Sequence, residues 1–249
     1  MKKLFVLFFV LLFCGQAWAD SKKISGTTNV EDAMIQAGGY ADNNYGGATE
    51  FTISATQYVL IKPKNVASEI GVGATMSACV CSAYCNTEVL GAKLIYAYRV
   101  FKPWVEGDED GVDDDDGDVT YNDWASDEYE WTLSGAGCYN DDGVDNSSDD
   151  GACDDAARRD RKQTYESSQS VNATGWFVWS ISAELAQDWY DGDANENGIL
   201  LFTSSNGSSI WNSTEAVSNQ PFFVFTYSTG GPPEIDKPRK NIMSGGIIK

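Results

Sequence analysis

An alternating apolar segment in the middle of the chain constrains the fold more than any other stretch. Residues 94–100 are Leu-Ile-Tyr-Ala-Tyr-Arg-Val, a pattern typical of a strand with one face in a core. An aromatic corner, Trp104-Val105-Glu106, follows it, and a run of acidic residues then leads to an apolar and aromatic segment at 119–124. We interpret this order as a core strand, a corner and an acidic loop, after which the chain turns back.

Other segments rich in β-branched and aromatic residues lie between Gly, Asn and Pro turn signals, which is the pattern of short strands. Such strands are predicted at 30–35, 50–53, 57–62, 175–181, 199–203 and 221–227. One short helix is predicted at 183–189, and the Gly-, Ala- and Cys-rich stretch 66–91 is expected to be irregular. Frequent short strands with little helix predict an all-β fold, a jelly-roll-type β-sandwich with long acidic loop insertions.

The first 19 residues have the order of a secretory signal peptide, with two lysines, an apolar run at 4–13 and Ala17-Trp18-Ala19. The run is shorter than the roughly 20 apolar residues that a spanning helix needs, so we expect no membrane insertion after signal cleavage. The predicted organisation is a signal peptide at 1–19, a β-sandwich domain at 20–228 and a linker-like tail at 229–249. The expected location is secreted, either extracellular or at the cell surface.

The charge excludes several classes of partner. The net charge is −20, and removal of residues 1–19 takes away two lysines and no acid, which brings it to −22. Nucleic-acid binding depends on neutralising phosphates with Lys and Arg, so nucleic acid is not expected as a partner, and neither is an anionic membrane surface. The chain has no histidine, which excludes a His-based catalytic triad and a His metal site.

Five cysteines remain after residue 19, and in an exported protein they are expected to form disulfides. We predict a bridge between Cys138 and Cys153, which would close an Asp-rich loop with little apolar content. A second bridge is predicted within the cluster of Cys79, Cys81 and Cys85. The fifth thiol is left either buried or available to cross-link another chain.

A series of short motifs occurs in a characteristic order along residues 28–228. They are Asp32-Ala33, Asn44-Tyr45-Gly46, Trp104-Val105-Glu106, Val119-Thr120-Tyr121-Asn122, Gly175-Trp176, Trp189-Tyr190-Asp191-Gly192, Asn197-Gly198, Ser213-Thr214-Glu215 and the strand 221–227. This order resembles that of the exported β-sandwich domains called DNRLRE or disaggregatase-related, which are grouped with carbohydrate-binding modules. The resemblance implies a non-catalytic extracellular module that binds polysaccharide or displays a surface.

The chain departs from that pattern in three places. An early strand of the family ends in Arg-x-x-Phe-Asp, where this chain has Leu-Ile-Lys-Pro-Lys-Asn at 60–65. The cysteine cluster is an insertion, and the acidic loop is far longer than usual. These departures bear on the identity of the ligand more than on the fold.

The strongest local chemical signal is the acidic run 108–118, in which glycines permit tight turns between carboxylates. Because Ca²⁺ takes about 6 to 8 oxygen ligands, we predict a structural calcium ion bound by Asp108, Asp110, Asp113, Asp115 and Asp118. The alternative is a solvated acidic loop that keeps the protein soluble. Residues 141–151 are a second candidate of this kind, and 193–198 imitate the first half of an EF-hand loop but lack its final acid.

Eight tryptophans suggest stacking against sugar rings, because flat aromatic faces suit the apolar faces of pyranoses. Trp104, Trp124, Trp131 and Trp211 lie near predicted loops and are the candidate ligand-binding residues. Trp176 and Trp179 share a predicted strand, where one must point inward. No pair of acids is distinguished for glycoside hydrolysis, so the chain is not predicted to be an enzyme.

Together these features predict a secreted, non-catalytic binding module with polysaccharide as its ligand class and calcium as a structural ion. A neutral glycan fits the charge more easily than an acidic one. The alternative is a structural subunit of an extracellular filament or surface layer, which would join neighbouring copies of itself through edge strands and the C-terminal tail.

Overall fold

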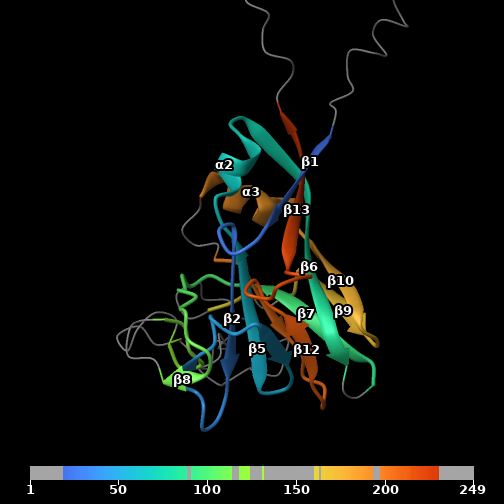
Figure 1. The fold of residues 1–249 in the computed structure, drawn as a ribbon. Helices are drawn as coiled ribbons and strands as arrows, with labels where there is room; N and C mark the ends of the chain where they lie inside the picture. Colours follow the sequence, from blue (N-terminus) through green and yellow to red (C-terminus); the bar gives the residue numbers. More distant parts are fainter. Residues whose placement is uncertain are drawn as a thin grey trace, which may run out of the picture.

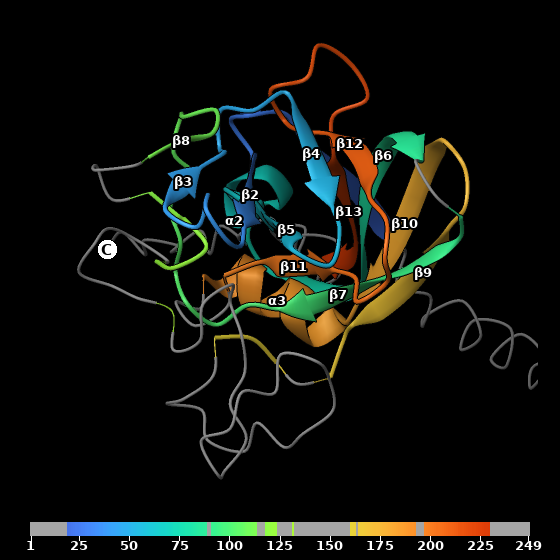
Figure 2. The same cartoon turned by 90° about the horizontal axis from the view of Figure 1, so that it is seen from below.

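The computed structural model describes residues 19–88, 91–113, 118–123, 131, 160–162, 164–192 and 197–229. In this part of the chain two antiparallel sheets pack face to face, as the view along the strands shows (Figure 2). The predicted all-β sandwich is therefore confirmed, while its jelly-roll connectivity stays a prediction. No helix among the described residues is long and apolar enough to cross a membrane.

The first sheet contains six strands. Five follow one another in the order β1 (Asp20–Ser25), β13 (Phe222–Thr229), β6 (Ala74–Glu88), β12 (Ser209–Asn212) and β4 (Glu50–Ile53). The sixth, β10 (Gly175–Ile181), pairs with residues 79–85 of β6. Because residues 79–82 of β6 also pair with β13, the strands β13 and β10 lie on opposite sides of β6.

The second sheet contains five strands in the order β2 (Val30–Gln36), β5 (Gln57–Pro63), β11 (Ile199–Phe202), β7 (Lys93–Arg99) and β9 (Ser167–Val171). A small ladder of β3 (Asn43–Asn44) and β8 (Val112–Asp113) lies beside β2 (Figure 2). Two short helices, α2 (Val66–Ile70) and α3 (Ala183–Asp191), lie together at one end of the sandwich (Figure 1).

Most predicted elements are found where the sequence pattern places them. The predicted strands correspond to β2, β4, β5, β7, β10, β11 and β13, and the predicted helix is α3. That helix begins after Ser182, whose hydroxyl accepts a hydrogen bond from the N–H of Leu185, and it ends at Gly192 with a φ of 74°. Cap and turn residues therefore delimit the helix locally.

The prediction of an irregular, disulfide-held stretch at 66–91 is wrong, because this stretch contains β6, the longest strand in the described chain. Inward-facing positions on β6 are Cys79, Cys81, Ala83 and Cys85, all buried. Residues two apart on a strand lie about 7 Å apart with parallel Cβ directions, whereas a disulfide needs Cβ atoms roughly 4 Å apart. No disulfide joins these three cysteines, and the predicted Cys138–Cys153 bridge lies outside the described residues.

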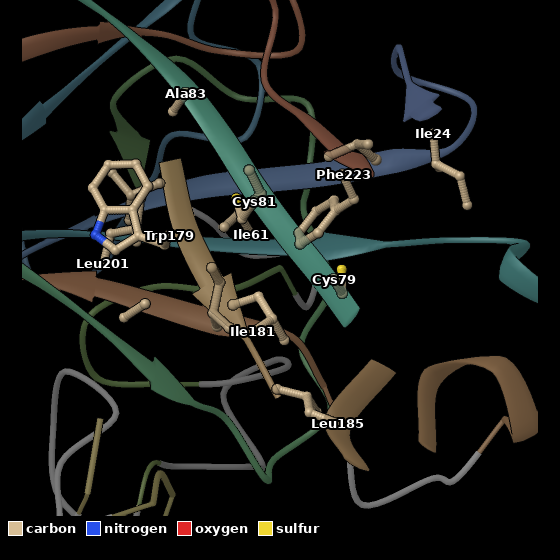
Figure 3. Packing of buried hydrophobic residues seen from close by; sticks show 14 of the residues in the cluster. Ile24, Ile61, Cys79, Cys81, Ala83, Trp179, Ile181, Leu185, Leu201 and Phe223 are labelled. Carbon is tan, nitrogen blue, oxygen red and sulfur yellow. The ribbon is translucent and has the colours of Figure 1, made fainter. Parts of the chain in front are cut away.

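The buried thiols behave as small core residues. Figure 3 shows Cys79 and Cys81 on β6 among Phe223 and Trp179 in the core between the sheets. Burial raises the pKa of both the Cys79 and the Cys81 thiol well above the ordinary value for cysteine. A neutral, buried thiol is a poor nucleophile and a compact apolar side chain. None of the three is therefore exposed for a cross-link to another chain.

A second apolar cluster covers the outer face of the second sheet. Trp104, Val119 and Trp131 pack there against residues such as Leu200 and Phe202 of β11. Since its other face is covered by the core between the sheets, all four residues of β11 are buried. This arrangement explains its uninterrupted apolar sequence, and it means that the corner after β7 is part of the core.

Candidate functional site

Three carboxylates from distant parts of the chain meet between the two sheets. Asp32 lies on the inward face of β2, Glu106 belongs to the corner after β7, and Glu215 follows β12. One oxygen from each carboxylate lies within 4.8 Å of the other two. We call these three residues the acidic cluster.

Asp32 is the buried centre of the cluster, with none of its surface exposed. Its Oδ2 accepts a hydrogen bond from the backbone N–H of Thr214 at 2.9 Å, and its Oδ1 lies 2.9 Å from the Thr214 hydroxyl. The backbone N–H of Asp32 in turn donates to Oε1 of Glu106 at 2.7 Å. Asp32 therefore links β2 of one sheet to the segment after β12 of the other, and it holds Glu106 beside them.

Among the described residues, the carboxylate oxygens of the cluster outnumber the hydrogen-bond donors that reach them. The Thr214 hydroxyl lies 2.9 to 3.0 Å from Oδ1 of Asp32 and from both carboxylate oxygens of Glu215. A hydroxyl has a single hydrogen, so it can donate to one of these acceptors at a time. Asp32 and Glu215 therefore share this hydroxyl donor, and a proton or a cation between them would stabilise the contact further.

The pKa values of Asp32 and Glu106 agree with this shortage of hydrogen-bond donors. Burial, followed by the charges of Glu215 and Glu106, raises the pKa of Asp32 well above its usual range. Burial raises the pKa of Glu106 to about 7, with Glu215 adding to the rise and the N–H of Asp32 opposing it. Buried carboxylates that repel one another take up a proton or bind a cation.

Two lysines near the cluster contact Glu31 and offset only part of the charge of the cluster. Lys62 and Lys64 each place Nζ 2.7 Å from a carboxylate oxygen of Glu31. Burial alone would raise the pKa of Glu31, but Lys62 and Lys64 outweigh it and the net shift is downward. Lys62 also lies over the indole ring of Trp104, 4.1 Å from its centroid. Lys64 also lowers the pKa of Glu106, but burial and the neighbouring carboxylates outweigh it, and the net shift of the Glu106 pKa is upward.

The cluster fits a hard divalent cation. Ca²⁺ binds oxygen at about 2.3 to 2.6 Å, so two oxygens on one ion lie at most about 5 Å apart. The 4.8 Å separation within the cluster meets that limit. Glu106 and Glu215 are partly exposed, which leaves a route for an ion and for the water ligands that would complete its shell.

Buried polar contacts hold the backbone of Glu106 in place. Nδ2 of Asn44 donates to the carbonyls of Glu106 and Val119, at 2.9 and 2.8 Å, and its Oδ1 accepts from the N–H of Gly46 at 2.9 Å. A Cβ on Gly46 would overlap the carbonyl oxygen of Glu106. The short distance between these two backbones therefore requires glycine at position 46.

The predicted calcium ligands are not the residues of the acidic cluster. Asp108 and Asp110 are exposed and Asp118 is half-buried, and these three do not form a group of possible metal ligands among the described side chains. The side chain of Asp113 and the whole of Asp115 lie outside the described residues, so calcium in this loop stays a prediction. The sequence signal that could have found the cluster is the place of its acids in short motifs, as with Asp32 in Asp32-Ala33 and Glu106 in Trp104-Val105-Glu106.

The predicted sugar-stacking tryptophans are buried, which corrects the expectation for three of them. Trp104, Trp131 and Trp211 are 2%, 4% and 2% exposed. Their indole N–H groups donate to the carbonyl of Asn197, the carbonyl of Thr120 and the hydroxyl of Ser209, respectively. Rings packed in this way offer no face to a saccharide, and Trp124 lies outside the described residues.

No protein-family model matches the chain, and a comparison with curated proteins finds no match. The resemblance to DNRLRE domains therefore stays a prediction. The residues of the acidic cluster nevertheless come one each from three of the motifs on which that resemblance rests, namely Asp32-Ala33, Trp104-Val105-Glu106 and Ser213-Thr214-Glu215.

Proposed function

We propose that the protein is a secreted, non-catalytic binding module with polysaccharide as its ligand class and with a structural calcium ion held by Asp32, Glu106 and Glu215. The observation that carries the proposal is the meeting of these three carboxylates between the sheets. An ion at this point would join both sheets and the corner after β7 in a single contact. Extracellular calcium modules bind with dissociation constants of about 10⁻⁴ to 10⁻³ M, which suits an exported protein.

A structural role suits the cluster better than a catalytic one. The cavity beside Asp32 has a volume of about 10 Å³ and is lined mainly by apolar side chains, among them Phe51 and Trp211. This volume holds about one water molecule and is far too small for a sugar ring. The small apolar cavity beside Asp32 therefore supports the proposal that the acids bind a structural ion.

Polysaccharide is the ligand class that agrees best with charge and sequence. A net charge of −20 disfavours nucleic acid and anionic surfaces. The motif order resembles that of carbohydrate-binding domains. A neutral glycan carries no charge for the acidic surface to repel, so it is favoured over an acidic one.

One feature favours a second function, that of a subunit in an extracellular filament or layer. Strand β1 is the terminal strand of the first sheet and pairs only with β13 in the described part of the chain. Its outer backbone edge could therefore pair with a strand from a neighbouring copy.

Binding to a panel of polysaccharides, measured with Ca²⁺ and with chelator, separates the two functions. We expect the purified protein to remain monomeric by light scattering and to bind at least one neutral glycan, with weaker binding in chelator. A protein that binds no glycan and forms calcium-dependent oligomers would contradict the module and favour the subunit. Deletion of 230–249 is the control, because it should leave glycan binding unchanged but reduce assembly that uses the tail.

A further inference from the structure

We propose that the outer face of the first sheet, centred on Trp176, is the surface on which a neutral saccharide chain binds. The inference rests on the proposed function and adds a place for the ligand. We define the Trp176 face by seven of the outward-pointing residues of three neighbouring strands, namely Val80, Ser82, Tyr84, Trp176, Val178, Phe222 and Val224. The strands β13, β6 and β10 that supply them lie side by side (Figure 1).

Strand register brings the aromatic residues of this face together. Trp176 on β10 lies directly opposite Tyr84 on β6, and Phe222 on β13 lies opposite Ser82 of β6. Ser82 is only 3% exposed although it points outward. The large rings on both sides therefore close over this small residue, and they form a continuous aromatic surface across three strands.

The neighbouring rings fix the position of Trp176. Its centroid lies 5.4 Å from that of Tyr84 at an interplanar angle of 72°, and 5.0 Å from that of Phe222 at 60°. Edge-on contacts of this kind are favourable and restrict the rotamers of the indole. Trp176 is still 43% exposed. A rigid, exposed indole loses little side-chain entropy when a ligand stacks on it.

The charge of the face suits a neutral saccharide. None of its seven residues is charged, in a chain whose net charge is −20. The adjoining cation is Lys23 of β1, whose Nζ lies 3.8 Å from the centroid of the Phe222 ring. A cationic partner would find no carboxylate among these seven residues. The hydroxyl groups of a sugar could accept hydrogen bonds from Lys23 and could donate to or accept from the hydroxyl of Tyr84.

The charge of the chain argues against a second copy as the occupant of the face. Two copies that each carry a net charge of −20 repel one another, and a net charge this far from zero keeps proteins monomeric. The Trp176 face spans three strands, which suits a short stretch of pyranose rings, one of which stacks on Trp176. The ligand we assign is therefore a neutral hexose or pentose polysaccharide.

The test compares Trp176→Ala, Trp176→Phe and a control, Tyr165→Ala, by affinity electrophoresis and calorimetry on a soluble β-glucan, a xylan and a galactomannan. Tyr165 is 50% exposed and packs on Tyr96 and Tyr98 of the second sheet, so its loss removes an exposed ring elsewhere. We expect a loss of affinity of about tenfold or more for Trp176→Ala, a smaller loss for Trp176→Phe and no change for the control. Unfolding midpoints confirm that each variant is folded.

Wild-type binding that persists in a folded Trp176→Ala variant would overturn this inference and leave the proposed function intact. Should Trp176→Ala fail to fold, full affinity in Trp176→Phe together with full affinity in Tyr84→Ala would overturn it equally. Absence of binding by the wild type to every glycan would overturn the proposed function itself. Dimers that Trp176→Ala dissociates would show that the face joins copies of the chain instead.

Discussion

Replacing Glu106 by Gln should stabilise the calcium-free protein and destabilise the calcium-bound one. Glutamine keeps an oxygen that can accept the N–H of Asp32, which Glu106 accepts at 2.7 Å, but it removes one of three mutually repelling charges. Without the ion, that repulsion is a cost of folding. With the ion, the same carboxylate is a ligand. The substitution should therefore raise the free energy of unfolding without Ca²⁺ and lower it with Ca²⁺.

The magnitude follows from the pKa of Glu106. Burial raises it from 4.5 to about 7 in the folded protein. At 1.36 kcal/mol per pH unit this corresponds to about 3 kcal/mol, and we take about half of that because Glu106 is partly exposed and screened by solvent. The folded state binds more protons than the unfolded state between pH 4.5 and about 7, so stability falls as pH rises through this window.

Urea unfolding of wild type and Glu106→Gln, from pH 5 to pH 8 in chelator, measures this effect. We expect equal stability near pH 5 and an advantage of about 1 to 2 kcal/mol for the variant at pH 8. In saturating Ca²⁺ the wild type should be more stable than Glu106→Gln. The control is Glu109→Gln, which makes the same change in net charge outside the acidic cluster. A variant that is less stable than wild type at pH 8 in chelator, or a control with the same gain, would show that the charge of Glu106 does not specifically destabilise the calcium-free protein.

Three further predictions concern the residues around the site and the core. Gly46→Ala should cost about 1 to 3 kcal/mol in urea unfolding because its Cβ overlaps the Glu106 carbonyl, while Gly39→Ala, where a Cβ meets nothing within 4 Å, should cost little; equal costs would contradict the packing. Thr214→Val should destabilise the calcium-free protein by about 1 to 3 kcal/mol by removing the shared donor, and a change below about 0.5 kcal/mol would show that this hydroxyl is dispensable. The cysteines of β6 should resist alkylation in the folded protein and react after denaturation, as read by mass spectrometry; rapid labelling of Cys81 in native buffer would show that the strand is not buried.

Strands with apolar residues on the core side were predictable because their signal is local. In β4, β5 and β10, β-branched and aromatic residues lie between turn residues, and the predicted bounds agree with the structure to within about one residue. Strands at sheet edges gave no such signal. Both β1 and β9 are polar edge strands, and they are ordered by pairing with β13 and β7 rather than by their own composition.

The longest strand was missed for two physical reasons. Strand β6 is built mainly from Ala, Ser and Cys, which have little intrinsic preference for strands. Its alternation is also interrupted, because Ala78 pairs with Thr226 while Met76 pairs with Tyr227, which leaves Ser77 as an extra residue. A bulge of this kind shifts the inward positions from one set of alternate residues to the other and conceals the period of two.

The acidic cluster could not be found from acid density. Composition directs attention to 108–118, whereas the three clustered carboxylates are separated by more than 70 residues of chain in each interval and meet only through the sandwich. The burial of Trp104 and Trp131 has the same origin. Both flank loops in the sequence, but the segment after β7 folds back over the outer face of the second sheet and takes their rings into the core.

Calorimetric titration of Ca²⁺ into chelator-treated protein shows whether the acidic cluster binds the ion. We compare the wild type with Asp32→Asn, which alters the buried centre of the acidic cluster, and with a double variant, Asp108→Asn and Asp110→Asn, which alters the acidic loop. We expect the wild type and the loop variant to bind an ion equally and Asp32→Asn to lose this binding. Unchanged binding in Asp32→Asn, or loss of binding only in the loop variant, would contradict this expectation.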